Sequence, residues 1–209
     1  MTAPGVEVTP MSSNDVPAAV GVLARGMRDN PIHVAAFGPD AERRERLLTR
    51  MFSAMWRHWD VEHALCARRD GELVGVCGRL APGRCRLTAL QSLHATPAIL
   101  ASGPRTAIRT LRWVGAWGKR DPRERHEHLG PVAVDRHLQG LGIGSAMLSV
   151  HAEALDIQRL TGWLETDKAE NVRLYERFGY TVVERAEVLG VPNWFMRRDA
   201  QGLGARAAS

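Results

Sequence analysis

The chain has 209 residues, of which 44% are hydrophobic and 24% charged, and a chain of this size can bury one substantial core. The N-terminus lacks the basic and apolar regions of a signal peptide, and charge or glycine interrupts every apolar run before the roughly 18 residues of a membrane span. These features exclude a membrane partner and predict a cytoplasmic protein. We expect one domain over residues 1–198 and an unstructured tail over residues 199–209.

The three cysteines, Cys66, Cys77 and Cys85, have no CxxC spacing. Their odd number and their spacing fit a reduced compartment and argue against a disulfide framework or a zinc site. We expect them to fill the core, and we expect no metal.

The net charge of +5 is concentrated between residues 105 and 125, where seven basic residues face only Asp121 and Glu124. Arg105, Arg109 and Arg112 are spaced to share one side of a helix, which is typical of a solvated face. The alternative is an electropositive rim that attracts a polyanionic ligand. Few aromatic rings and no RRM, KH or zinc-finger pattern argue against nucleic acid as a partner.

The N-terminal half predicts a strand, two helices and a hairpin. Val6–Thr9 is a short strand, and the SSND run offers N-cap residues to a helix with apolar positions from Val16 to Met27. A second helix carries an apolar stripe from Leu47 to Trp56. Two strands then flank an Asp70-Gly71 turn.

Residues 88–125 hold helical patches broken by prolines, so one or two helices and a loop are expected there. After them the pattern is regular. LGPVAV is a strand, SAMLSVHAEALD a helix, TGWLET a strand, and AENVRLYERF a helix that ends at Gly179. Strand, helix and strand imply a parallel pair. TVVERAEV and NWFMRR close the chain as an antiparallel hairpin, which gives a mixed sheet flanked by helices.

The run LQGLGIGSAML, residues 138–148, joins a strand to a helix and has glycine at every second position from Gly140 to Gly144. Unpaired N–H groups and the positive end of the helix dipole make such a place an anion site, and glycine lets the main chain approach a ligand. The pattern therefore indicates a phosphate or pyrophosphate site.

Three other glycine-rich patterns are alternatives to this interpretation. A Walker A loop needs Lys-Ser/Thr after its last glycine, and Ser145-Ala146 does not provide it. A dinucleotide fingerprint has a glycine where Ser145 stands, although Glu165 imitates the ribose-binding acid. A glycine turn that only packs helix on strand remains the structural alternative.

The segment Gln139 to Gly144 matches the pattern Q/R-x-x-G-x-G/A at every position, and here the chain resembles the GNAT superfamily of N-acetyltransferases. The resemblance covers residues 126–198, through HLGPVAVDRHLQGLGIGSAML and LETDKAENVRLYERFGYTVVE. Within the superfamily the likeness is closer to puromycin N-acetyltransferase-like members. It implies an α/β (α+β) single-domain fold with a mixed, mostly antiparallel, twisted sheet of about six to seven strands that contains a splayed parallel pair.

The resemblance also implies a cofactor, acetyl-CoA. The loop amides would hold its pyrophosphate, and the backbone of the preceding strand would pair with its pantetheine, with the Val134 amide polarising the thioester carbonyl. Pro131 supports an interrupted ladder at this strand. The implied cofactor-binding residues are Val132, Ala133, Val134, Gln139, Gly140, Leu141, Gly142, Ile143, Gly144, Ser145 and Asn171.

Amine acetylation needs a base for the ammonium proton and an acid for the leaving thiolate. Tyr175 stands where the family places the acid, and Asn171 lies one helical turn earlier on the same face. For the base, His128 and Glu165 are candidates, and Glu127 is an alternative on the opposite face of its strand. A covalent route through cysteine lacks a neighbouring His pattern.

The predicted function is direct transfer of an acetyl group from acetyl-CoA to a primary amine of a small molecule or peptide. The resemblance is also compatible with a homodimer. The alternatives are a non-catalytic acyl-CoA sensor and a nicotinamide enzyme. Five tryptophans, Trp56, Trp59, Trp113, Trp117 and Trp194, either wall an acceptor site or belong to the core, and large aromatics favour the core.

Overall fold

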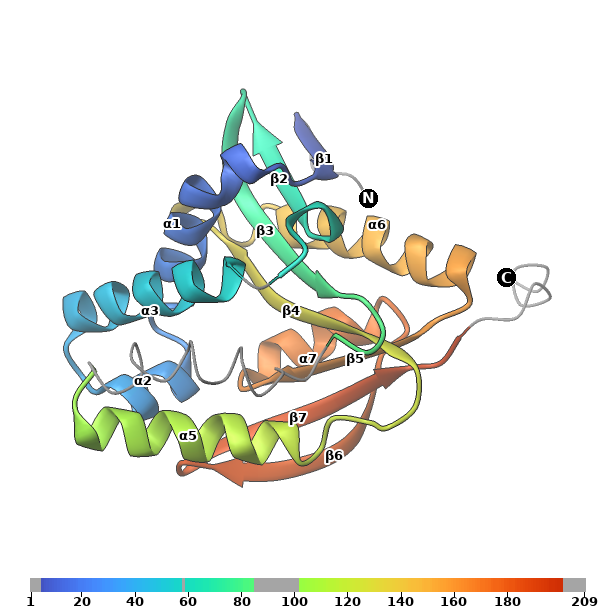
Figure 1. Ribbon diagram of the computed structural model, residues 1–209. Coiled ribbons are helices and arrows are strands. Elements are labelled where there is room, and N and C mark those ends of the chain that lie inside the picture. The colour runs from blue at the N-terminus through green and yellow to red at the C-terminus, as the bar shows by residue number, and fades with distance from the viewer. Residues whose placement is uncertain (1–4, 58, 85–101, 201–209) are drawn as a thin grey trace.

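A computed structural model describes residues 5–57, 59–84 and 102–200. One twisted sheet of seven strands runs through the molecule in the order β1-β2-β3-β4-β5-β7-β6 (Figure 1). The strands are β1 (Val6–Pro10), β2 (Leu65–Arg69), β3 (Glu72–Leu80), β4 (His126–Val134), β5 (Thr161–Thr166), β6 (Thr181–Val188) and β7 (Val191–Arg198). Only β4 and β5 pair in parallel among these strands. The sheet predicted from the sequence is confirmed.

Six α-helices lie in the described part of the chain. They are α1 (Val16–Met27), α2 (Pro31–Phe37), α3 (Ala41–Trp56), α5 (Pro104–Gly118), α6 (Ile143–Gln158) and α7 (Ala169–Glu176). None of the described helices is long and apolar enough to cross a membrane. The predicted helices are all present, and α2 is an additional helix that begins with Pro31 in its first turn.

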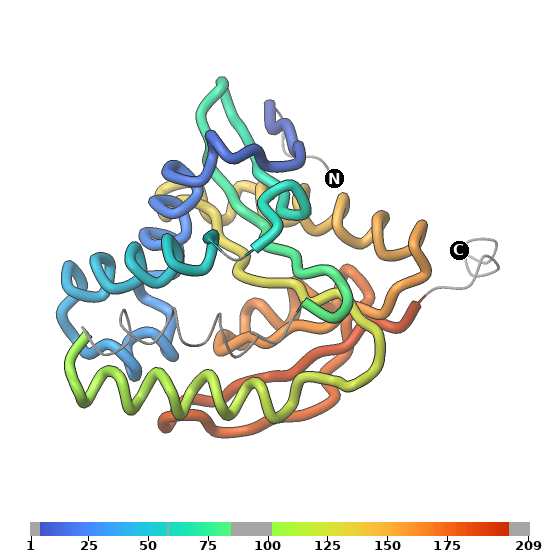
Figure 2. Tube along the Cα trace, in the orientation of Figure 1, coloured from blue at the N-terminus to red at the C-terminus, as the bar shows by residue number. Residues whose placement is uncertain are grey.

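Two apolar cores lie on opposite faces of the sheet. Helices α1, α2 and α3 and Trp113 of α5 form the first with Cys66 and Val76, while α6 and α7 form the second with Leu65 and Cys77. Alternate residues of β2 and β3 thus enter opposite cores, as the pleat requires. Figure 2 shows α5 running beside β6 and β7, so the C-terminal hairpin and α5 border the same edge of the first core.

Most of the tryptophans belong to these cores. Trp56 and Trp113 are buried in the first, Trp59 and Trp117 pack against it, and Trp194 packs against the second. Cys66 and Cys77 are buried free thiols, as expected. The predictions for Cys85 and for the tail from residue 201 onward fall outside the described residues, as does the predicted segment 88–101.

Strand β4 bulges where it passes β3. The register places Cys77 opposite Val132 and Arg79 opposite Leu129, so Gly78 faces both Gly130 and Pro131. A Cβ on Gly78 would lie 2.7 Å from the Gly130 carbonyl oxygen and 2.8 Å from Pro131 Cδ. Glycine is therefore required at position 78 for the two strands to approach at the bulge. The interrupted ladder that Pro131 indicated is confirmed.

Gly78→Ala should lower the free energy of unfolding by about 1–3 kcal/mol, because the added methyl group meets backbone atoms that cannot move aside. Urea denaturation measures the change. Gly115→Ala is the matched control, since a Cβ at this position of α5 meets nothing within 4 Å and alanine favours a helix. Equal stability of the two variants would contradict the close approach at the bulge.

Candidate active site

The glycine-rich loop connects β4 to α6 through a short 3₁₀ turn at Arg136–Leu138. Gly140 and Gly142 have φ of +83° and +84°, in the left-handed region that favours glycine, and Gly142 is the N-cap of α6. The first N–H groups of α6 have no acceptor within the helix, and its first turn carries no acidic side chain. A 16-residue helix thus presents its positive end at this loop, which is suited to an anion.

Gln139 fixes this loop to the rest of the fold. Its side-chain amide donates to the carbonyl oxygens of Gly26 in α1, at 3.3 Å, and Val134 in β4, at 3.0 Å. The C-terminal end of α1 approaches β4 so closely that a Cβ on Gly26 would lie 2.6 Å from the Val134 oxygen. The side chain of Gln139 therefore positions the loop.

Strands β4 and β5 separate after a short parallel stretch. Their pairing ends at His128 and Trp163, although β4 continues to Val134 and β5 to Thr166. Beyond this point the N–H of Asp135 donates to Val74 of β3, at 2.8 Å. Backbone groups alternate in direction along a strand, so those of Ala133 also face β3, whereas those of Val132 and Val134 face away from it. One edge of β4 thus remains unpaired by β5, next to the glycine-rich loop.

Tyr175 lies in α7, buried in the second core together with Val132 and Val134. Its ring contacts that of Tyr180 edge-on, with centroids 6.1 Å apart. Within the described residues, no group forms a hydrogen bond with its hydroxyl, and burial raises the pKa of this phenol far above its usual value. Asn171 donates to Thr166 at the end of β5, at 3.4 Å, so α7 is held beside the separating strands.

His128 and Glu165, predicted separately as bases, are in contact. His128 Nε2 lies 2.9 Å from a Glu165 oxygen, and the second carboxylate oxygen accepts from Trp163 Nε1 at 2.8 Å. On the other side of the ring, His128 Nδ1 lies 3.5 Å from Asp121 Oδ1. The same Asp121 oxygen lies 3.2 Å from His126 Nε2. The structure thus assembles two histidines and two carboxylates on one face of β4 and β5.

Glu127 lies on the opposite face and is fully buried. Its carboxylate pairs with Arg79 at 2.8 Å, His63 at 2.9 Å and His151 at 3.1 Å. Burial by itself would raise the pKa of Glu127, but the hydrogen bonds from His151, His63 and Arg79 outweigh this and lower it well below its usual range. A buried carboxylate so firmly ionised is a poor base, and it is separate from the His128 and Glu165 pair.

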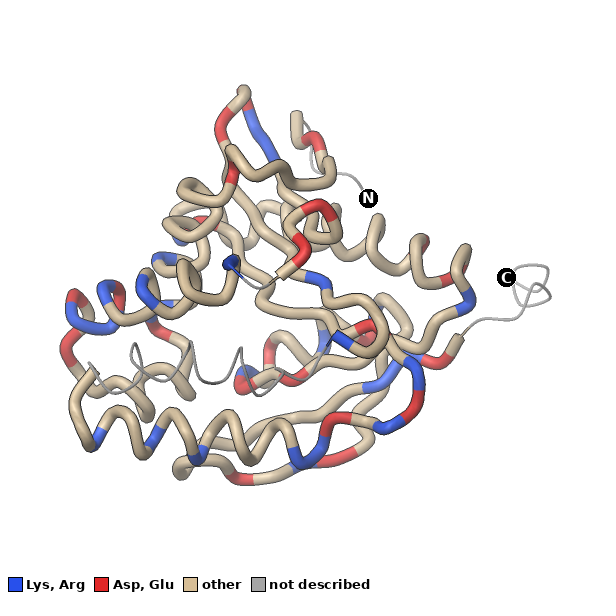
Figure 3. Tube along the Cα trace, in the orientation of Figure 1, with Lys and Arg blue, Asp and Glu red and all other residues tan. Residues whose placement is uncertain are grey.

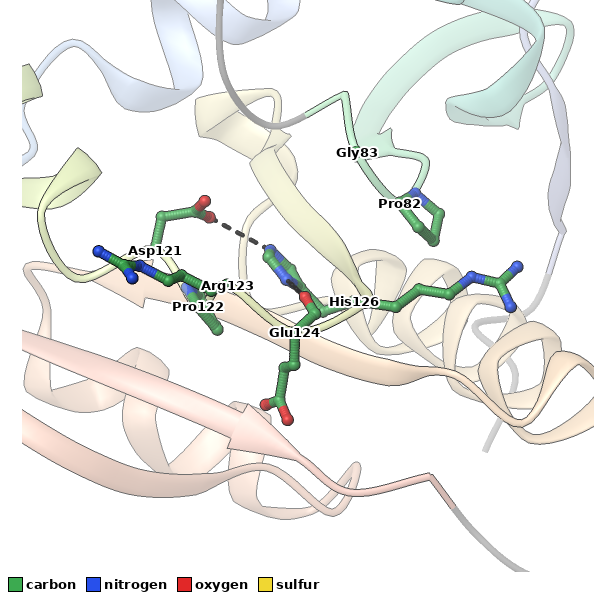
Figure 4. A pocket seen from close by; sticks show the side chains of 8 residues that line it. Pro82, Gly83, Asp121, Pro122, Arg123, Glu124 and His126 are labelled. Atoms are coloured by element: carbon green, nitrogen blue, oxygen red, sulfur yellow. Dashed lines mark hydrogen bonds and ion pairs between the residues drawn. The ribbon is translucent and has the colours of Figure 1, made fainter.

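A pocket of about 470 Å³ opens beside Asp121 and His126, lined also by Pro82, Gly83 and the connection to β4. Figure 4 shows the Asp121 carboxylate turned toward the His126 ring, while the Glu124 side chain points away from it. Charged residues crowd the connection between α5 and β4 in Figure 3, and Arg105, Arg109 and Arg112 of α5 are exposed, as a solvated face requires.

Asp121 and His126 were not among the predicted site residues. The signal for them was His126 and His128 at the strand spacing of two, which puts both rings on one face. Asp121 precedes them in a connection whose course the sequence left open.

Comparison with known proteins assigns this chain to a family. A family model described as the acetyltransferase (GNAT) family matches residues 35–180. The fold is similar to a protein of Corynebacterium glutamicum described as histone acetyltransferase HPA2 and related acetyltransferase, at 20% identity and a TM-score of 0.69, covering 95% of this chain and 98% of that one. It is also similar to the ribosomal-protein-S18-alanine N-acetyltransferase of Escherichia coli, at 15% identity and a TM-score of 0.56, covering 96% and 97% of the two chains. A third similar structure is the polyamine N-acetyltransferase of Drosophila melanogaster, at 13% identity and a TM-score of 0.62, with 93% and 99% covered. This chain belongs to the GNAT family of acetyltransferases.

Proposed function

We propose that this protein transfers the acetyl group of acetyl-CoA directly to a primary amine of a small molecule or peptide. The observation that carries the proposal is the unpaired edge of β4, which leads from the glycine-rich loop toward buried Tyr175. The polyamine and ribosomal-protein-alanine N-acetyltransferases of similar fold are named for amine acceptors, which supports an amine here. Bound acetyl-CoA would supply an acetyl group activated as a thioester.

The residues around the loop fit this cofactor. The N–H groups from Gly140 to Ser145, with Leu141 and Ile143 between the glycines, would donate to its pyrophosphate at the positive end of α6. The N–H groups of Val132 and Val134, which face away from β3, would donate one to its amide-bearing arm and one to the thioester oxygen, where negative charge develops. Ala133 supports the strand by pairing with β3, and Asn171 and Gln139 hold α7 and the loop in place.

The acceptor's proton would go to His128. Glu165 can only accept hydrogen bonds when ionised, so it binds the Nε2–H tautomer of the neutral ring and leaves Nδ1 with a lone pair. The carboxylate also stabilises the imidazolium that forms when Nδ1 takes the proton, much as a carboxylate supports histidine in hydrolases. His128 and Glu165 thus act as one unit in this proposal.

Tyr175 would donate a hydrogen bond to the departing sulfur. Because burial raises the pKa of this phenol, full transfer of its proton to a thiolate costs more than it would for an exposed tyrosine. A neutral donor aimed at developing negative charge still lowers the barrier to cleavage of the carbon–sulfur bond. The proton that restores the free thiol then comes from solvent.

The test is thiol release from acetyl-CoA by the full chain over a panel of polyamines, aromatic and nucleoside-like amines, and peptide N-termini. We expect turnover with at least one acceptor and a product heavier by one acetyl group in mass spectrometry. The panel includes puromycin because the sequence of residues 164–182 and 193–198 predicts a likeness to the puromycin-acetylating members, which this assay tests. Binding of CoA without turnover of any amine would favour the non-catalytic sensor.

Gly142→Val should abolish the thermal shift given by CoA, because valine is strained at a positive φ and projects into the anion site. Gly190→Val is the matched control. Its φ of +78° in the β6–β7 turn imposes the same backbone strain far along the chain from the loop. Loss of the CoA shift in both variants would show a folding defect, and its retention in Gly142→Val would overturn the proposed pyrophosphate site.

A further inference from the structure

The cluster formed by Asp121, His126 and His128 has the composition of a metal site. Asp121 Oδ1, His126 Nε2 and His128 Nδ1 lie within 4.8 Å of one another, and all three residues are buried or half-buried. Two imidazoles and a carboxylate are a common donor set for zinc and related divalent transition metals.

The two distances from the Asp121 oxygen to the ring nitrogens match the edges of a coordination tetrahedron. Asp121 Oδ1 lies 3.2 Å from His126 Nε2 and 3.5 Å from His128 Nδ1. Bonds of about 2.0–2.1 Å from Zn²⁺ to nitrogen and oxygen place tetrahedral ligand atoms roughly 3.3 Å apart. Without the ion, the 3.2 Å contact between His126 and Asp121 is a hydrogen bond, and the metal would displace its proton.

The surroundings of both rings orient the correct nitrogen atoms. His126 Nδ1 donates to the Glu124 carbonyl oxygen at 2.8 Å, which leaves the lone pair of the neutral ring on Nε2. His128 Nε2 donates to Glu165 at 2.9 Å, which leaves the lone pair on Nδ1. Metal-binding histidines commonly hold a carbonyl or a carboxylate on their second nitrogen in this way. The pocket beside Asp121 and His126 gives access from solvent and room for a fourth ligand such as water.

We propose that Asp121, His126 and His128 bind one divalent transition-metal ion, of which Zn²⁺ is the best match, through Oδ1, Nε2 and Nδ1 respectively. The ion occupies the same nitrogen of His128 that takes the acceptor's proton in the proposed acetyl transfer. Zn²⁺ therefore inhibits that transfer, and this second statement alone rests on the proposed function. This proposal differs from the sequence-based expectation of no metal, and the titration below decides between them.

Calorimetric titration of the metal-free full chain with Zn²⁺ tests the binding, and Co²⁺ reports geometry through its visible absorption. We expect one ion per chain at micromolar or tighter affinity, with a tetrahedral Co²⁺ spectrum. Asp121→Asn and His126→Ala should each weaken binding by at least about 10-fold, and Glu165→Gln, which retains all three ligands, by about 10-fold. His137→Ala should leave it unchanged, because His137 is exposed and pairs with Asp135, which is outside this cluster.

The site would be overturned if His137→Ala weakened zinc binding as much as the ligand variants do. It would also be overturned if Asp121→Asn and His126→Ala both bound Zn²⁺ with an affinity within threefold of the wild type. If a ligand variant fails to fold by circular dichroism, anomalous scattering at the zinc edge from wild-type crystals decides the matter. An ion bound by these three atoms supports the proposal, and an ion elsewhere overturns it. Inhibition is measured as the ratio of the rates of thiol release with and without Zn²⁺. Zinc binding is measured separately, so a protein that binds zinc but acetylates no amine refutes only the proposed function.

Discussion

Glu127→Gln is expected to lower the free energy of unfolding by about 3–5 kcal/mol at pH 7. The substitution leaves the guanidinium of Arg79 buried, with 8% of its side chain exposed, and without the carboxylate that neutralises it. It also removes the negative charge that His63 and His151 share. Guanidinium denaturation of both proteins at pH 7 measures the loss.

The pH dependence of this loss has a definite sign. The hydrogen bonds to Glu127 lower its pKa in the folded protein below that in the unfolded chain, about 4.3, so its contribution is complete above pH 4.3 and declines as pH falls further. The difference between wild type and variant should therefore narrow in acid.

Glu184→Gln is the matched control for this measurement. Glu184 also pairs with an arginine, Arg120 at 2.6 Å, but 47% of its side chain is exposed, and a surface pair of this kind contributes at most about 1 kcal/mol. A loss from Glu127→Gln no larger than that from Glu184→Gln would show that the buried charges are compensated by water or by rearrangement.

Local sequence signals predicted most of the fold, because the backbone conformations that they favour are the ones that the structure adopts. Asp70 and Gly71 both adopt positive φ, at 53° and 84°, which is the conformation that an Asp-Gly hairpin turn needs. Helix α2 was missed for the opposite reason. It has seven residues, and Asp167, which directly follows β5, stabilises its first turn. The Asp167 carboxylate accepts a hydrogen bond from the Ile32 N–H at 2.7 Å. No local pattern encodes a partner 135 residues away.

The candidate site was predicted less completely, because its contacts depend on strand register. The sequence placed His128 and Glu165 on neighbouring parallel strands, but only the pairing of His128 with Trp163 brings the carboxylate two residues later within 2.9 Å of the ring. The two glycines before α6 were predictable, since glycine is the residue that most readily adopts the positive φ that this tight turn requires. The position of Asp121 depends on where α5 ends, which the sequence did not define.

Tyr175→Phe is expected to lower kcat for acetyl transfer by about 100-fold, at the lower end of the range for loss of a proton-donating group. The KM for acetyl-CoA should change little, because the hydroxyl contributes to departure of the sulfur and the phenyl ring retains the packing in the second core. Since burial raises the pKa of Tyr175, its ionisation should produce no falling limb in the wild-type pH profile of kcat up to pH 10. Steady-state thiol release between pH 6 and 10 measures all three quantities.

Tyr180→Phe is the control that separates chemistry from packing. Tyr180 is the other tyrosine of the chain, and its buried hydroxyl hydrogen-bonds to His151 Nε2 at 2.7 Å in the second core. Its loss should destabilise the fold by about 1–3 kcal/mol and leave kcat within a few fold, when both variants are assayed well below their melting temperatures. Equal losses of kcat would indicate that Tyr175 acts through packing. A Tyr175→Phe enzyme with unchanged kcat would remove its hydroxyl from the mechanism and leave departure of the thiolate to solvent alone.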